Sequence, residues 1–365
     1  MPLTKQHFHG SDLEKIEAIY HISKEDIVNF AANVNPIGIS YDVRNELPKH
    51  IDAITSYPDR DYTALRKSIA KYVHTSPDHI LVGNGSTELI SLVAQVMHPH
   101  NALILGPTYS EYEHEISLCG GTSHYFHLQE EQDFVLDLKA LQSSLAGVDL
   151  LVICNPNNPT SSQIPRDTMR EILEYCKQQN TYVMVDETYV EFAPSASELT
   201  SIPLADNYDN LIVLRGVSKF FASPGLRLGY CICSSQALLQ QCNEHKNPWT
   251  INSLAVEAGE IMLRDTAYIK DTYELIDSER TRICHILDEH ADKIKYYPPS
   301  ANFILLRLIN TTVTAQDVFE QAIQKGLMIR DCSTFPYLDD SFLRFCFMKP
   351  EDNDRLLEVL FACLQ

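Results

Sequence analysis

The chain is poor in features that mark several specialised classes of protein. It has one Trp among 365 residues, and 29 Lys and Arg stand against 49 Asp and Glu, which leaves a net charge of −20. This shortage of basic residues argues against non-specific binding to nucleic acid or to an anionic membrane surface. No apolar run exceeds the length of a strand, and the start MPLTKQHFHG has no apolar stretch behind basic residues. We therefore expect neither a membrane-spanning helix nor a signal peptide.

Cysteine is present without the spacing of a metal site. The ten Cys are scattered, no CxxC pair occurs, and the single CxC pair is Cys231 and Cys233. This pattern is typical of buried thiols in a reducing cytoplasm, so we expect neither a disulfide framework nor a metal site. With 44% hydrophobic and 21% charged residues, the composition is that of a globular protein with a sizeable core.

Helix-period stretches alternate with short β-branched runs, which predicts a parallel α/β sheet. The predicted strands are 80–83, 102–105, 150–154, 182–186, 211–215 and 229–233. Several are apolar throughout, as expected of strands covered by helices on both faces.

After about residue 260 the pattern changes to that of a smaller α+β domain. Its predicted elements are helices at 266–291, 314–325 and from 351, and strands at 303–308, 327–330 and 343–347. We therefore expect three parts, namely an arm at 1–35, a large domain at 36–260 and a small domain at 261–365.

The segment GNGSTE, residues 83–88, lies between a predicted strand and a predicted helix. Its glycines allow a ligand to approach the backbone, and the N-terminus of a helix binds anions, so a phosphate group is the expected ligand. A plain Ser or Thr helix cap is the alternative. A dinucleotide fold is set aside because the third Gly of GxGxxG is missing.

Further polar residues follow the later strands. Asn158 lies in the rigid loop NPNNPT, and Asp186 ends a buried strand, where its carboxylate needs a cationic partner or a helix start. Lys219 lies between apolar neighbours, where a lowered pKa would make its amine a nucleophile toward an aldehyde, and Arg227 offers a second phosphate anchor. Pyridoxal 5′-phosphate is the cofactor that uses all of these groups.

The ordered motifs GNGSTE, PTYSEYE, NPNNPT, VDETY, SK and PGLRLGY resemble those of fold-type I pyridoxal-phosphate enzymes, in the class I/II aminotransferase family, over essentially the whole chain. The resemblance implies a large domain with a mostly parallel central sheet flanked by helices, plus a smaller α+β domain. The resemblance also implies that Lys219 binds the cofactor's aldehyde and moves the proton, and that Asp186 pairs with the pyridine nitrogen. Tyr109 would stack on the ring, and Asn158 and Tyr189 would donate hydrogen bonds to its phenolic oxygen. The phosphate would be held by Gly85, Ser86, Thr87 and Arg227, and in a homodimer Tyr57 would reach the phosphate of the neighbouring subunit.

Two positions depart from the family pattern. Gly216 stands three residues before Lys219, where Ser or Thr is usual, and Ser161 follows NPNNPT where Gly is usual. The first change removes one neutral hydrogen bond to the phosphate, worth about 1 kcal/mol. Whether Ser218 compensates is left open by the sequence.

Two branches of the family are similar to this sequence: histidinol-phosphate aminotransferases and L-threonine O-3-phosphate decarboxylases, which act in cobalamin side-chain synthesis. The second resemblance is stronger in the segments HG at 9–10, FAANVNPIG at 30–38, PWTINSLA at 248–255 and IRDCSTF at 329–335. The resemblance implies that His9, Asn33 and Arg330 bind the substrate, with His9 and Arg330 on its phosphate. The resemblance also implies that Arg344 binds the substrate carboxylate.

The sequence thus predicts a cytoplasmic, homodimeric enzyme that decarboxylates L-threonine O-phosphate or its serine analogue. An aminotransferase acting on histidinol phosphate with glutamate and 2-oxoglutarate is the alternative, and because both chemistries use the same residues the sequence leaves the choice open. An effector-sensing regulator is disfavoured because no basic winged-helix segment precedes the fold. Plainer roles also stay open: a rim salt bridge for Arg330, a solvated His9, core packing for Trp249 and a turn for Asn302.

Overall fold

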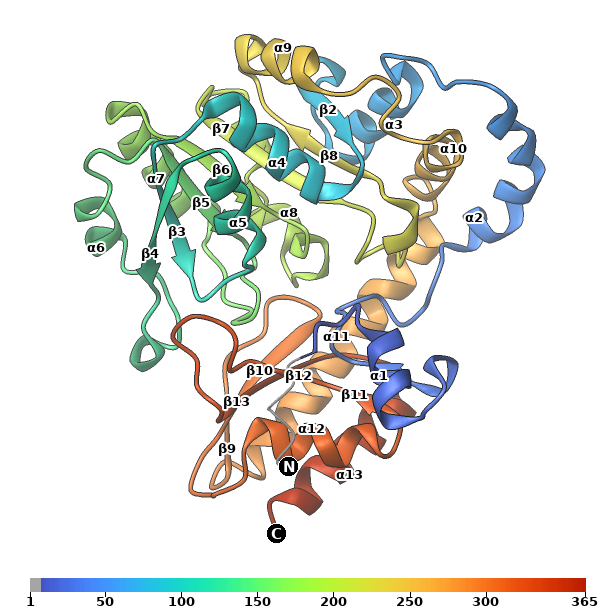
Figure 1. The fold of residues 1–365 in the computed structure, drawn as a ribbon, viewed down its shortest axis with the longest axis vertical. Coiled ribbons are helices and arrows are strands. Elements are labelled where there is room, and N and C mark those ends of the chain that lie inside the picture. The colour runs from blue at the N-terminus through green and yellow to red at the C-terminus, as the bar shows by residue number, and fades with distance from the viewer. Residues whose placement is uncertain (1–7) are drawn as a thin grey trace.

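The structure is a computed structural model that describes residues 8–365, so the first seven residues of the predicted arm lie outside it. Two layered units lie one above the other in Figure 1, and helix α11 (Thr266–Asp288) leads from the upper unit into the lower one. The upper unit is built on a seven-stranded sheet and the lower one on a four-stranded sheet.

The strand order of the upper sheet is β2-β8-β7-β6-β5-β3-β4. Its strands are β2 (Ile80–Gly83), β3 (Asn101–Gly106), β4 (Thr122–His127), β5 (Leu150–Cys154), β6 (Tyr182–Asp186), β7 (Leu211–Gly216) and β8 (Gly229–Ile232). All run parallel except β8, which pairs antiparallel with β2 and β7. The connection from β7 to β8 contains no α-helix, only a single 3-10 turn at Pro224–Leu226, and β8 returns antiparallel beside β7. The prediction of a mostly parallel sheet is confirmed, and 229–233 is its exception.

Helices cover this sheet, as its apolar strands require. They are α2 (Tyr41–Glu46), α3 (Thr63–Val73), α4 (Gly85–Met97), α5 (Glu111–Leu118), α6 (Leu138–Ser143), α7 (Arg166–Gln178), α8 (Ala196–Leu199), α9 (Gln236–His245) and α10 (Ser253–Met262). Helix α4 lies against β7 and β8, and α7 against β6. Every residue of β5 and β7 is buried, so these strands expose polar groups only beyond their ends.

The sequence pattern missed the edge strand β4. Its first four residues alternate between exposed and half-buried positions, its last two are half-buried, and the sequence TSHYFH has no continuous apolar run. β4 pairs with β3 alone and none of its residues is fully buried, so the continuous apolar signal that revealed the other strands is absent there.

The lower unit contains β9 (Ile294–Tyr296), β10 (Phe303–Leu308), β12 (Arg330–Asp331) and β13 (Phe342–Cys346), with helices α12 (Ala315–Ile323) and α13 (Pro350–Cys363). The predicted single strand 327–330 is wrong. It divides into β11 (Leu327–Met328), which pairs with β1 (Val28–Asn29), and β12, which pairs with β13. The chain changes sheets at Ile329, and this change places Arg330 directly opposite Arg344.

The start of the described chain lies against the lower unit. Helix α1 (Leu13–Tyr20) precedes β1, and the ring of Phe8 stacks on that of Phe319 with centroids 5.5 Å apart. We propose the sequence-based division as the domain organisation: an arm at 1–35, a large domain at 36–260 and a small domain at 261–365. Among the described residues no helix is long and apolar enough to cross a membrane.

A buried ion pair joins the ends of β6 and β7. Arg215 donates to Glu187 Oε2 at 2.9 Å from Nη2 and 3.2 Å from Nε, and both side chains are almost fully buried. Thr200 donates to the same carboxylate oxygen at 2.7 Å. The pair thereby ties together the strand ends that lead to Asp186 and Lys219.

Replacing Glu187 with Ala should lower the free energy of unfolding by about 3–5 kcal/mol, because the Arg215 guanidinium would stay buried without its partner. Asp209→Ala removes an exposed ion pair with Lys177 and is the matched control, with an expected cost below about 1 kcal/mol. Urea denaturation of the three proteins measures both changes. Equal losses in the two variants would show that the Glu187 pair is no stronger than a surface pair.

Candidate active site

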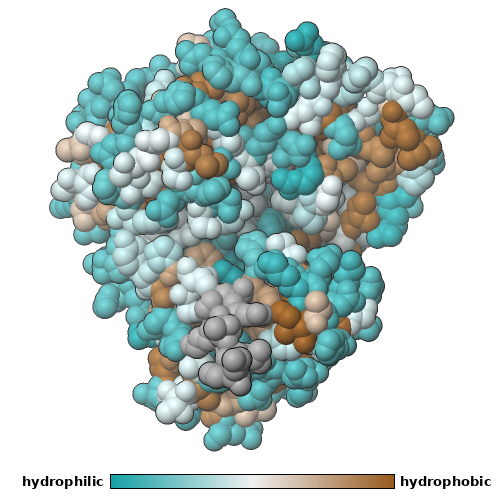
Figure 2. All heavy atoms as spheres, in the orientation of Figure 1, coloured by the Kyte–Doolittle hydropathy of each residue, from teal (hydrophilic) through white to brown (hydrophobic). Residues whose placement is uncertain are grey.

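A cavity of about 940 Å³ lies between the two units and receives side chains from both. Figure 2 shows the surface hollowed at this level, between the upper and lower halves of the molecule. The sequence-predicted residues that line it are His9, Asn33, Ser86, Thr87, Tyr109, Asn158, Asp186, Tyr189, Ser218, Lys219, Arg227, Arg330 and Arg344. Gly85 lies beside the cavity and not in its lining, and Tyr57 lies on the surface.

One end of the cavity is suited to an anion. Helix α4 begins at Gly85, so the backbone N–H groups of its first turn have no partner within the helix. The Arg227 guanidinium lies beside them and donates to the Asn84 carbonyl at 3.3 Å. A Cβ on Gly85 would lie 2.3 Å from Arg227 Nη2, so only glycine leaves room for this approach. Arg227 precedes β8 and does not follow a strand, and it reaches this edge because β8 runs in reverse.

The plain helix cap is wrong for this segment. The N-cap residue of α4 is Asn84, which makes no side-chain capping bond. Ser86 and Thr87 instead lie within the first turn and line the cavity. The Thr87 hydroxyl also interacts with Tyr109, whose pKa burial raises to about 12, so that Tyr109 stays a neutral phenol.

Asp186 ends β6 with its carboxylate buried at the cavity wall. Thr188 donates to Oδ1 from its backbone N–H at 2.9 Å and from its hydroxyl at 2.6 Å. Burial raises the pKa of Asp186, and these hydrogen bonds oppose that shift. A cationic ligand group beside the carboxylate would stabilise its ionised form.

Lys219 follows β7 after a short loop and points its amine into the cavity. The Nζ atom donates to the Ala32 carbonyl at 2.6 Å. Burial lowers the pKa of Lys219 to about 8, and the positive charges of Arg344 and Arg227 act in the same direction. At neutral pH a larger share of this amine is therefore unprotonated than for an ordinary lysine.

Arg344 is held at the centre of a network that links the two units. Its guanidinium donates to Asn158 Oδ1 and, at 2.7 Å, to the Ala31 carbonyl. Asn33 Nδ2 donates to the Tyr189 hydroxyl at 3.4 Å, while Asn33 Oδ1 is buried with no hydrogen-bond partner among the described residues. An orphaned acceptor at the wall of a cavity is the state expected of a ligand contact.

Arg330 on β12 and His9, near the start of the described chain, also line the cavity. Arg330 donates to the Phe8 carbonyl and, at 2.7 Å, to the Thr334 hydroxyl, so the rim salt bridge is wrong. His9 Nδ1 lies 3.0 Å from the Ser11 hydroxyl, and burial, followed by the charge of Arg330, lowers the pKa of His9. His9 is thus a polar group of the cavity wall, although much of its side chain is exposed.

Ser161 has a structural reason to replace glycine. Its φ of 60° is the left-handed conformation that favours Gly, yet its side chain is fully buried. The hydroxyl accepts hydrogen bonds from the backbone N–H groups of Ser300 at 3.0 Å and Ala301 at 2.9 Å. It therefore fastens the loop that carries Asn158 to the lower unit. Asn302, next in the chain, lies in the bend before β10, is not among the lining residues of the cavity, and donates to the Asn33 carbonyl at 3.0 Å.

Trp249 does not pack in the core. Its side chain is 42% exposed and lies against Tyr57, with ring centroids 4.8 Å apart. The Arg60 guanidinium lies over the Trp249 ring at 5.8 Å. These residues form part of the surface of the upper unit, so the expectation of core packing is wrong.

Sequence reasoning missed three residues at Asp186, namely Tyr112, Thr188 and Cys154, which also line the cavity. Tyr112 lies in the motif PTYSEYE and Thr188 in the motif VDETY, and this membership was the only sign in the sequence that they belong to the site. The donor set as a whole fits pyridoxal phosphate: an anion site, a buried amine, a buried carboxylate and an orphaned amide oxygen surround one cavity. Among residues 8–365 no cluster of three or more His, Cys, Asp or Glu could hold a metal ion.

The reaction of Lys219 with an aldehyde should reach half its maximal rate near pH 8 in the cofactor-free protein. Only the neutral amine attacks, so the rate rises with pH through the lowered pKa and not through the ordinary value of about 10.4. Reductive trapping at a series of pH values, followed by peptide mass spectrometry, measures the midpoint. Arg344→Gln should raise the midpoint, because it removes a positive charge near the amine. A midpoint at the ordinary lysine value in the parent protein would refute the effect of burial.

Comparison with known proteins agrees with this geometry. Residues 25–360 match the family model described as aminotransferase class I and II. A relative in Caldanaerobacter subterraneus subsp. tengcongensis, provisionally named threonine-phosphate decarboxylase, is 37% identical over 90% of this chain and 88% of its own. The threonine-phosphate decarboxylase of Salmonella typhimurium is 32% identical over 96% of this chain and 95% of its own.

A solved structure gives the same result. The histidinol-phosphate aminotransferase of Clostridium acetobutylicum superposes with a TM-score of 0.85 at 31% identity, and the match covers 91% of this chain and 98% of that one. The fold is therefore that of fold-type I pyridoxal-phosphate enzymes, as the sequence predicted. The chain belongs to the class I and II aminotransferase family.

Proposed function

We propose that the cavity binds pyridoxal 5′-phosphate. When bound, this cofactor supplies an electron sink that accepts the electron pair of a bond broken at the substrate's Cα. Lys219 would hold the cofactor's aldehyde carbon and carry the proton, and Asp186 would pair with the ring nitrogen. Tyr109 would face the ring, and Asn158 and Tyr189 would bond its phenolic oxygen.

The anion end of the cavity would hold the cofactor phosphate. The start of α4 with Gly85, Ser86 and Thr87 would supply hydrogen bonds, and Arg227 would supply charge. Ser218 also lines the cavity, next to Lys219 in the chain, and would be a further hydroxyl donor to the phosphate.

We propose decarboxylation of L-threonine O-phosphate, or of its serine analogue, as the reaction. One observation carries this proposal: Arg330 and Arg344 are opposite each other on paired strands and line the same cavity as Lys219. A substrate that carries both a phosphate and a carboxylate would use both guanidinium groups. Arg330 and His9 would bind the phosphate, Arg344 would bind the carboxylate, and Asn33 would make a further contact to the substrate. The two relatives named for this reaction support the choice.

The alternative is transamination of histidinol phosphate. The similarity to the Clostridium acetobutylicum enzyme supports it. Histidinol phosphate has a phosphate and no carboxylate, so Arg344 would be left for the dicarboxylic partner, glutamate or 2-oxoglutarate. The two reactions therefore differ in whether a keto acid is needed.

We propose that the enzyme is a homodimer. Ile54 is 62% exposed and Tyr57 80% exposed in the segment that follows α2. Figure 2 shows hydrophobic residues gathered at the upper right of the molecule, the side on which Figure 1 draws α2. A second copy seated there would cover this surface, and Tyr57 would reach the neighbour's cofactor phosphate. We also propose a cytoplasmic location, which the ten free cysteines support.

Gly216→Ser should tighten cofactor binding about fivefold. A Cβ at this position would meet its nearest neighbour, the Leu228 carbonyl oxygen, at 3.4 Å, so a side chain fits. The added hydroxyl would restore one hydrogen bond to the phosphate, worth about 1 kcal/mol. Equilibrium dialysis of the apoprotein against pyridoxal phosphate measures the dissociation constant, with Gly216→Ala as the control that adds bulk alone. No difference between Ser and Ala would refute the missing hydrogen bond.

Incubation of the cofactor-loaded protein with L-threonine O-phosphate tests the reaction. We expect carbon dioxide and aminopropanol phosphate, identified by mass, whether or not 2-oxoglutarate is present. Lys219→Ala should still bind the cofactor but lose turnover, because no other lysine among residues 8–365 lines the cavity. Glutamate formed only from histidinol phosphate and 2-oxoglutarate would assign transamination instead, and retained activity in the Lys219 variant would overturn the site.

A further inference from the structure

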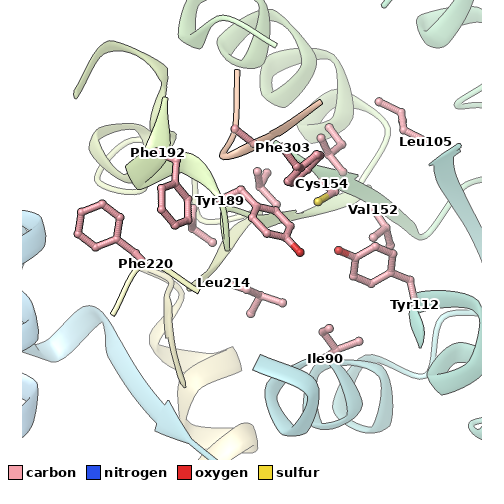
Figure 3. Close-up of a cluster of buried hydrophobic side chains, with 14 of the residues drawn as sticks. Ile90, Leu105, Tyr112, Val152, Cys154, Tyr189, Phe192, Leu214, Phe220 and Phe303 are labelled. Carbon is pink, nitrogen blue, oxygen red and sulfur yellow. The ribbon is translucent and has the colours of Figure 1, made fainter. Parts of the chain in front are cut away.

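Tyr112 is a buried residue of α5 whose hydroxyl reaches the proposed cofactor site. The hydroxyl donates to Asp186 Oδ2 at 2.7 Å, and 1% of the residue's surface is exposed. Figure 3 shows the hydroxyls of Tyr112 and Tyr189 pointing toward one another, with Cys154 nearby. Tyr112 is part of the hydrophobic core, and both Tyr112 and Asp186 line the cavity.

The hydrogen bonds of Asp186 fix the plane of its carboxylate. Thr188 makes two bonds to Oδ1, and Tyr112 makes one to Oδ2. A carboxylate has about four acceptor positions, so the three donors leave one unused. Because Asp186 lines the cavity, that free position can serve a ligand. Without Tyr112, Oδ2 would have no donor among the described side chains to hold it in place.

Tyr112 also contacts the residue proposed to face the cofactor ring. Its ring packs edge-on against Tyr109, with centroids 5.7 Å apart and an interplanar angle of 85°. The loop before α5 and its first turn thus place one aromatic ring at the ring face and one hydroxyl at the carboxylate. A shift of Tyr112 would disturb both contacts.

We propose that Tyr112 is a positioning residue for the cofactor, which orients the Asp186 carboxylate toward the ring nitrogen through its hydrogen bond to Oδ2. This proposal rests on the proposed cofactor role of Asp186. Tyr112 does not touch the reacting atoms, so its effect falls on cofactor binding and on the rate of the chemical step. Substrate affinity, which depends on Arg330 and Arg344, should stay unchanged.

Tyr112→Phe removes the hydroxyl and keeps the ring. We expect the dissociation constant of pyridoxal phosphate to rise about tenfold, and kcat to fall by a similar factor with KM unchanged. The nitrogen-15 chemical shift of labelled cofactor should also move toward that of an unprotonated ring, because the carboxylate is less well aimed. Tyr208→Phe is the matched control, since it removes a hydroxyl that donates to Glu174 at 2.8 Å on the surface. This control should change none of the three values.

A double-mutant cycle with Asp186→Asn separates positioning from general packing. If Tyr112 acts through Asp186, the loss of cofactor affinity caused by Tyr112→Phe should largely vanish in the Asn background. An equal loss in both backgrounds would show a packing effect and overturn the proposal. Unchanged affinity and chemical shift in Tyr112→Phe would also overturn it, while the proposed function stands. Failure of the parent protein to bind the cofactor would overturn both.

Discussion

Strands β5, β6 and β7 run parallel and are almost entirely buried, so they can present polar side chains to a ligand only at their ends. This constraint determines where the candidate active site lies. Asn158, Asp186 and Lys219 follow three neighbouring strands and must meet at one edge of the sheet. The reversal of β8 adds Arg227 from the opposite direction, since its amino end lies at the same edge.

The lower unit completes the site because the two units are tied together by polar contacts. Ser161 accepts hydrogen bonds from the segment before β10, and Arg344 on β13 donates a hydrogen bond to Asn158 in the upper unit. These contacts join the residues proposed for the cofactor to those proposed for the substrate. A departure from the family pattern, Ser161, is thus part of the connection between the units.

Among residues 8–365, the neighbouring buried carboxylates of Asp186 and Glu187 both have partners. Asp186 has three donors, and Glu187, the next residue, is paired with Arg215. The two carboxylates differ in what they face: Glu187 is enclosed by protein, whereas Asp186 lines the cavity. Since an uncompensated buried charge is costly, the open side of Asp186 marks where a cationic ligand group belongs.

The sequence by itself determined the apolar central strands, the order of the motifs and the residue types at each strand end, because these depend on local pattern. Strand 303–308 and the loop residues Asn158 and Lys219 were predicted in this way. The tertiary structure decided what depends on distant neighbours. It set the edge strand β4, the division of 327–330 between two sheets, and the surface position of Trp249. It also brought Tyr112 to Asp186 across 74 positions, a contact that no local periodicity encodes.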